Sequence, residues 1–202
     1  LRSQEGLSQV CPLCRTDLPP GPEEAYMNGC SLYMKLDRNS TTESQLDEMM
    51  RSFKSSAEEG FAIAQNALGI MYSKDRRVKQ DYDEARGWLL KAASQGYAAS
   101  QHRLGIFYCH GLGVKQDFVK AHELFLKAES QGHVETQHYL GILYHDGVGV
   151  KKDYVKAHEW FLKAANRDHV DSQARLGDMY LGNNELKKDY TEARKWFLKA
   201  AS

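Results

Sequence analysis

The sequence predicts an all-α fold, an α-solenoid of antiparallel helix pairs behind a short irregular leader. The dipeptide Leu-Gly recurs at a step of 36 residues, at 68–69, 104–105, 140–141 and 176–177. A tyrosine follows each leucine by four residues, and no segment alternates apolar and polar residues as a strand would. Self-similarity at a fixed period of 20–50 residues indicates units that bury their apolar faces only against neighbouring units.

The first element is a leader over residues 1–22, which holds all four prolines of the chain and few periodic apolar residues. Its segment Pro-Pro-Gly-Pro at 19–22 predicts a stiff linker rather than a helix. The leader also carries the pair Cys11-Pro12-Leu13-Cys14.

Residues 23–60 predict a degenerate first helix pair. One helical pattern starts near Glu23 and is interrupted by the polar stretch 37–42, and a second runs from about Glu43 to a stop at Gly60. Phe53 lies one 36-residue period before Leu89, which places this pair in phase with the clear repeats.

Residues 61–202 predict four repeats, at about 61–96, 97–132, 133–168 and 169–202. The first helix of each carries Gln-x-x-Leu-Gly-x-x-Tyr, at roughly 62–74, 98–110, 134–146 and 170–182. A glycine in mid-helix costs about 1 kcal/mol relative to alanine. Its recurrence therefore predicts a close approach between helices that a Cβ atom would block.

The second helices are expected at roughly 81–94, 117–130, 153–166 and 189–202, each opening on an aspartate. A carboxylate there accepts hydrogen bonds from the unpaired N–H groups of the first turn. This role explains all four copies at once, whereas a catalytic pair would not need four. The aspartates are Asp81, Asp117, Asp153 and Asp189.

The pattern Ala-x-x-x-Leu-Gly-x-x-Tyr-x-x-Gly-x-Gly-Val-x-x-Asp-Tyr-x-x-Ala-x-x-Trp-Phe-x-Lys-Ala-Ala-x-x-Gly is nearly complete from His138 to Ala165. It resembles the Sel-1-like repeat family, relatives of the tetratricopeptide repeat, and the resemblance covers about residues 60–202. Two loops depart from the pattern. The glycines are replaced by Asp75 and Arg77 in the first repeat and by Asn183 and Glu185 in the fourth. We therefore expect these loops to be reshaped or less ordered.

The segment from Val10 to Arg15 resembles the closing Cys-Pro-x-Cys-Arg of a RING-type zinc finger. Cys11 and Cys14 could bind one Zn²⁺, but a structural zinc needs four ligands, and the other two would precede Leu1. We therefore expect no metal on this chain alone, and zinc in a longer protein that supplies the remaining ligands. A redox Cys-x-x-Cys and a chance pair remain as alternatives.

The composition limits the kinds of partner and the cellular compartment that we expect for this chain. Lys+Arg and Asp+Glu balance at 27 each, which argues against nucleic acid or an anionic membrane surface as partner. No run approaches the roughly 18 apolar residues of a membrane helix. Four cysteines without a disulfide framework favour a reducing compartment, cytoplasmic or nuclear. No phosphate loop, nucleophile elbow or acid–base pair appears, so we expect a protein that is not an enzyme.

The histidines do not predict a metal site. Equivalent histidines in consecutive repeats would lie about 10 Å apart by helix-packing distances, too far to share one ion. They are interpreted as surface or groove residues.

A stripe on the first helices is the predicted binding site, because first helices of such solenoids line the concave side. The alternative is that its isoleucines pack between adjacent first helices. The predicted function is a scaffold that binds a protein or peptide. Its alternatives are the substrate-recruiting part of a RING-type ubiquitin ligase, which would also bind a ubiquitin-conjugating enzyme, and a structural adaptor without a finger. The predicted binding residues are Asn66, Ile70, His102, Ile106, Cys109, His138, Ile142 and His145.

Overall fold

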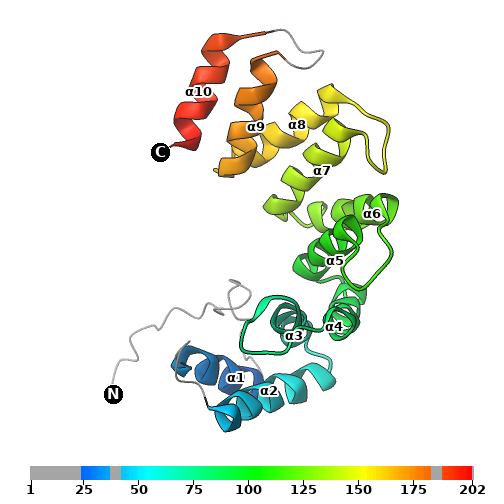
Figure 1. Ribbon diagram of the computed structural model, residues 1–202, viewed down its shortest axis with the longest axis vertical. Helices are drawn as coiled ribbons and strands as arrows, with labels where there is room; N and C mark the ends of the chain where they lie inside the picture. Colours follow the sequence, from blue (N-terminus) through cyan, green and yellow to red (C-terminus); the bar gives the residue numbers. More distant parts are fainter. Residues whose placement is uncertain (1–23, 37–41, 183–187, 202) are drawn as a thin grey trace. The chain divides into compact units, whose positions relative to one another are not determined.

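A computed structural model describes residues 24–36, 42–182 and 188–201, and every regular element in these ranges is an α-helix (Figure 1). The predicted all-α repeat fold is confirmed. Within the same ranges, no helix is long and apolar enough to span a membrane. The helices are α1 (Glu24–Lys35), α2 (Glu43–Glu58), α3 (Ala62–Lys74), α4 (Tyr82–Ser94), α5 (Ala98–His110), α6 (Phe118–Glu129), α7 (Val134–Asp146), α8 (Tyr154–Ala165), α9 (Val170–Tyr180) and α10 (Tyr190–Ala200).

The chain divides into two compact units, residues 1–100 and residues 101–202. In the first unit, each helix from α1 to α4 packs against the next one in sequence. In the second unit, the same holds from α6 to α10. Sequential packing of this kind is what a stack of helix pairs requires, since each pair contacts only its neighbours.

The degenerate pair before the repeats is formed by α1 and α2. Thr42 begins α2 with a capping box, in which its hydroxyl accepts from the Gln45 N–H and the Gln45 side chain accepts from the Thr42 N–H. Phe53 is fully buried, and its ring meets Tyr26 of α1 edge-on at 5.7 Å between centroids. The pair therefore has an apolar core although its sequence signature is eroded.

The glycine of the Leu-Gly motif marks a close helix contact, as predicted. A Cβ atom added at Gly141 would lie 2.5 Å from the Phe161 ring, and one at Gly177 would lie 2.6 Å from the Phe197 ring. Real Cβ atoms do not approach carbon this closely. Only glycine lets the second helix of each repeat lie directly on the first.

The recurring aspartates cap the second helices, as predicted. The Asp81 carboxylate accepts from the N–H groups of Asp83 and Glu84 at 3.0 Å, and the other three aspartates make equivalent bonds. The Asp81 N–H itself donates to the Tyr72 carbonyl at 2.9 Å, and this bond also recurs in every repeat. Each aspartate thus begins the second helix and closes the loop back onto the end of the first.

In two of the repeats, the glutamine of the motif binds the end of the preceding helix. Gln65 Nε2 donates to the Ala57 carbonyl at 2.9 Å, and Gln173 Nε2 donates to the Ala165 carbonyl at 3.2 Å. The last carbonyls of a helix have no partner within the helix. A buried side chain of the following repeat satisfies one of them here, a role that the sequence pattern did not indicate.

The loop of the first repeat is reshaped by the two residues that replace glycines. Arg77 binds the Asp75 carboxylate through two nitrogens, at 2.9 and 2.6 Å, and its guanidinium lies 4.2 Å from the Tyr33 ring centroid in α1. Burial alone would raise the pKa of Asp75, but the hydrogen bonds from Arg77 outweigh it and lower that pKa. This loop is held to the N-terminal helix pair. The loop with Asn183 and Glu185 lies outside the described residues.

Candidate partner-binding face

The predicted stripe is buried in the first unit. Asn66 is fully buried and Ile70 is 7% exposed. The Asn66 side-chain oxygen accepts a hydrogen bond from the Ser100 hydroxyl at 3.0 Å, 34 residues further along the chain. A buried amide needs such a partner, and here the next first helix supplies it.

The same positions are buried in the second unit, at His102 and His138. His102 Nδ1 lies 3.0 Å from the Thr136 hydroxyl, and His138 Nδ1 lies 2.8 Å from the Ser172 hydroxyl, again 34 residues away. The interpretation of these two histidines as surface or groove residues is wrong. A polar ring is accepted in the layer between first helices because a hydroxyl of the next helix binds it.

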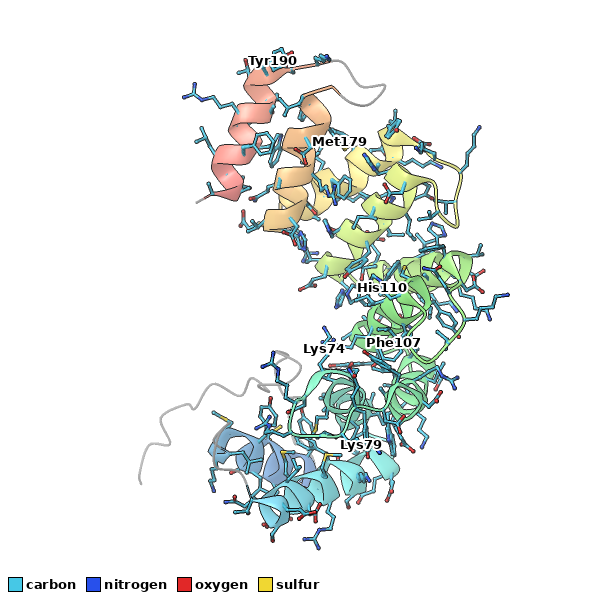
Figure 2. All side chains as sticks on the ribbon, in the orientation of Figure 1. Lys74, Lys79, Phe107, His110, Met179 and Tyr190 are labelled. Carbon is cyan, nitrogen blue, oxygen red and sulfur yellow. The ribbon has the colours of Figure 1, made fainter. Side chains whose placement is uncertain are left out.

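The isoleucines support the packing alternative. Ile106 is partly buried against a cluster that includes Cys109 and Phe125, and Cys109 itself is buried. Ile142 is partly buried against the cluster of Leu176, Met179 (labelled in Figure 2) and Trp196.

His145 is partly exposed, with Nδ1 2.7 Å from the Asp146 carboxylate. Of the eight predicted binding residues, Ile106, Ile142 and His145 keep partial exposure.

The more exposed side of the first helices overlaps the predicted stripe at the isoleucine position and otherwise consists of other residues. Glu135, Tyr139 and Ile142 of α7 follow each other at i, i+4 and i+7, so they share one side of the helix. The equivalent positions of α5 and α9 are likewise partly or fully exposed. We call this set the first-helix face of the second unit: Arg103, Ile106, Glu135, Tyr139, Ile142, Asp171, Arg175 and Asp178.

Tyr139 lies at the middle of this face and is half-buried. Its ring centroid is 5.3 Å from that of Phe125 and 5.9 Å from that of His138. Burial, with smaller contributions from Cys109 and Asp171, raises the pKa of Tyr139 above its ordinary value of 10. A rigid aromatic ring with a hydroxyl donor is the kind of group that anchors protein partners.

The face carries both signs of charge. Arg103 and Arg175 occupy the same repeat position as Tyr139, and acidic side chains lie one turn before it in α7 and α9. Such a surface suits a partner of mixed charge rather than a polyanion. These positions differ from repeat to repeat, which was the signal available in the sequence for finding them.

The side chains that could bind a metal ion do not form a metal site in the described part of the chain. Among residues 24–36, 42–182 and 188–201, no group of three or more His, Cys, Asp or Glu side chains could hold a metal ion. Cys11 and Cys14 lie outside these residues.

Comparison with known families matches the Sel1 repeat four times in succession, at residues 62–97, 98–133, 134–169 and 170–202. The chain therefore belongs to the Sel1 repeat family. Sel1 repeat proteins are generally scaffolds for protein–protein interaction. No curated protein matches the chain. The RING-like segment precedes all four matches and stays a prediction.

Two solved structures are similar over most of the chain. One is c5321, a protective antigen of uropathogenic Escherichia coli strains displaying an SLR fold, with 31% identity and a TM-score of 0.77 over 88% of this chain and 37% of that one. The other is a Sel1 repeat protein from Oxalobacter formigenes, with 30% identity and a TM-score of 0.76 over 87% of this chain and 69% of that one. The chain thus spans little more than a third of the first protein's length.

A third structure shares the fold at lower identity. It is Helicobacter pylori cysteine rich protein B, with 22% identity and a TM-score of 0.51 over 66% of this chain and 96% of that one.

Proposed function

We propose that this chain is a non-enzymatic scaffold that binds an extended segment of a partner protein on the first-helix face of its second unit. One observation carries the proposal. Arg103, Tyr139 and Arg175 occupy equivalent positions, 36 residues apart, on the more exposed side of the first helices. The positions just before the first two, His102 and His138, are instead taken up by packing between repeats.

The face offers three kinds of contact to such a segment. Arginine binds carboxylates through two parallel hydrogen bonds. The partly exposed edges of Ile106 and Ile142 offer apolar surface, and Tyr139 offers an aromatic anchor. Tyrosine and arginine are enriched among the few residues that dominate binding energy. The partner is therefore expected to carry acidic side chains for the arginines, basic side chains for Glu135 and Asp171, and apolar side chains between them.

A displayed peptide library panned on the 202-residue chain tests the proposal. Peptides that are selected should lose about 10-fold or more in affinity for Arg175→Ala and Ile142→Arg, measured by fluorescence polarisation. Matched controls are Arg194→Ala and Tyr190→Ala on α10, where both residues are exposed (Tyr190 is labelled in Figure 2). Peptides that respond to the α10 variants and not to Arg175→Ala would place binding elsewhere and refute the assignment.

A second candidate rests on the residues from Val10 to Arg15. In a longer protein, Cys11 and Cys14 would complete a zinc site with upstream cysteines or histidines, and the finger would recruit a ubiquitin-conjugating enzyme in a reducing compartment. The repeats would then select the substrate. Metal analysis of the longer protein should give zinc that is lost in Cys11→Ser, and absence of zinc from the wild-type protein would exclude this candidate.

A further inference from the structure

The histidines of this chain are confined to its second unit. All eight lie between residues 102 and 169. Six of them sit at contacts between helices, in two recurring arrangements. The six are His102, His122, His133, His138, His158 and His169.

In the first arrangement one hydroxyl bridges two imidazoles. The Thr136 hydroxyl lies 3.0 Å from His102 Nδ1 and 2.9 Å from His133 Nδ1, and the two ring centroids are stacked 4.6 Å apart. One repeat later, the Ser172 hydroxyl does the same at 2.8 and 3.1 Å, with the rings of His138 and His169 4.7 Å apart.

This geometry fits neutral imidazoles. A hydroxyl has one hydrogen, so when both rings are neutral it donates to the Nδ1 atom of one ring. It then accepts a hydrogen bond from the Nδ1–H group of the other ring, or that second Nδ1 atom binds a different donor. In the second bridge the Ser172 backbone N–H also donates to His169 Nδ1 at 3.2 Å, where His169 is the N-cap of α9. That nitrogen must therefore carry no proton, and protonating His169 there removes the cap.

Protonation also brings two positive charges together. His138 is 9% exposed, so a charge on its ring would be poorly solvated. Burial lowers the pKa of His138 to about 4, and His169 and Arg175 act in the same direction while Asp171 opposes them. The remaining groups around the ring are the edge of Tyr139 and the apolar Phe161 of α8.

The first bridge has the same electrostatic surroundings. Burial lowers the pKa of His133, Arg103 adds to this, and Glu135 opposes it with a carboxylate oxygen 3.5 Å from Nδ1. His102 faces the rings of Phe125 and Tyr139.

The second arrangement pairs a histidine of a second helix with the motif tyrosine of the next first helix. His122 Nε2 lies 3.3 Å from the Tyr144 hydroxyl, and His158 Nε2 lies 2.9 Å from the Tyr180 hydroxyl. Burial lowers the pKa of both histidines, against the opposing charges of Glu123 and Glu159 respectively. Lys156 lowers that of His122 further.

We propose that the two hydroxyl-bridged histidine pairs form an acid-sensitive joint, which holds α5, α7 and α9 together while the rings are neutral and loosens when they are protonated. The first unit provides the comparison within the same chain. Its equivalent positions hold Asn66, Tyr97 and Ser100, none of which titrates between pH 4 and 7. The joint does not depend on the binding face proposed above.

The direction of the pH effect follows from linkage. A histidine whose pKa is lowered by folding does not affect the stability of the fold at a pH above its ordinary pKa of 6.5. Stability falls as the pH drops from 6.5 toward the lower pKa that the histidine has in the folded state. For His138 alone, the folding equilibrium constant of the second unit falls about 30-fold between pH 7.5 and pH 5.0.

Urea unfolding at these two pH values tests the joint on the whole 202-residue chain. Pulsed hydrogen exchange with mass spectrometry gives a separate midpoint for each unit. The second unit should lose much more of its midpoint at pH 5.0 than the first. The double variant His138→Asn with His169→Tyr, which copies Asn66 and Tyr97, should remove the part of that loss that the second bridge contributes. His110→Asn should leave the loss unchanged because His110 is exposed at the end of α5 (Figure 2).

A second measurement holds even if the double variant does not fold. Proton NMR of the histidine rings in the wild-type chain should show His138 titrating at least one pH unit below the ordinary histidine value of 6.5. Titration of His138 near 6.5, or an equal loss of midpoint in the wild type and the folded double variant, would overturn the proposal.

Discussion

The two units share one repeat pattern and differ in the polar layer between consecutive first helices. In the first unit, the Asn66 amide accepts from the Ser100 hydroxyl. In the second, the same position holds His102 or His138, each bound to a hydroxyl that also reaches a second histidine. The backbone closures at aspartate and tyrosine are the same in both units. The polar side chains that join consecutive first helices can therefore differ between repeats while the helical fold stays the same.

The largest expected effect compares the glycine contacts of the two units. Gly141→Ala should destabilise the second unit by about 1–3 kcal/mol, because the new Cβ meets the flat Phe161 ring. Gly69→Ala should also destabilise the first unit, because the new Cβ meets the fully buried Leu89 and comes close to the Ala85 carbonyl oxygen.

Thermal unfolding measures both, with Gly87→Ala as the matched control. Gly87 is also helical but has open space at its Cβ, so alanine should stabilise α4 by about 0.5–1 kcal/mol. Unchanged stability in Gly69→Ala or Gly141→Ala would contradict the close helix contact that we assign to these glycines.

Transplanting the histidine bridge should carry its pH response into the first unit. Asn66→His with Tyr97→His places two imidazoles beside the Ser100 hydroxyl. The first unit should then lose about 1–2 kcal/mol between pH 7.5 and pH 5.0, a loss absent from the wild type. Unit-resolved urea midpoints measure it, and a pH-independent midpoint in a folded variant would show that the bridge alone does not confer the response.

The first unit has its own titrating contact in a lower pH window. Arg77→Ala removes the ion pair with Asp75 and the contact with Tyr33, and it should destabilise this unit by about 1 kcal/mol at neutral pH. Because folding lowers the pKa of Asp75, this stabilisation is present above its ordinary value of 3.8 and is lost only as the pH falls below it. Urea midpoints of Arg77→Ala and wild type that converge already at pH 5.0 would contradict this window.

The smallest effect concerns the turn before α9. Asp168 has φ +61°, whereas the equivalent Gly96 and Gly132 of the preceding repeats have φ +86° and +80°. Asp168→Gly should stabilise the second unit by about 0.5–1 kcal/mol, since a side chain in the left-handed region is strained. Its exposed ion pair with Lys199 is a small loss by comparison. Asp168→Ala, which keeps the Cβ atom, is the control and should give no such gain in melting temperature.

The repeats could be predicted from the sequence because glycine and aspartate act locally. Gly141 and Asp81 each have one role that their position in the pattern requires. The side of the first helix that is exposed could not be predicted as well. Asn66 and His102 look like surface residues until a hydroxyl 34 residues away is known to bind them. Periodicity alone cannot distinguish a solvated polar side chain from a buried one with a partner.

The loop at Arg77 illustrates the same limit of pattern reasoning. Loss of its glycines indicated a different loop, but its attachment to Tyr33 depends on a helix 44 positions earlier. The zinc-finger resemblance of Cys11 and Cys14 lies outside the described residues and stays a prediction.

The motif glutamine has a consequence for how such a chain can grow. Gln65 and Gln173 each donate to a terminal carbonyl of the preceding helix, so the first turn of one repeat completes the end of the helix before it at these two positions. A duplication of 36 residues keeps each such glutamine in register with the helix that it follows, whereas a shorter insertion between the two would separate the donor from the carbonyl. The array is thus expected to lengthen or shorten in whole periods.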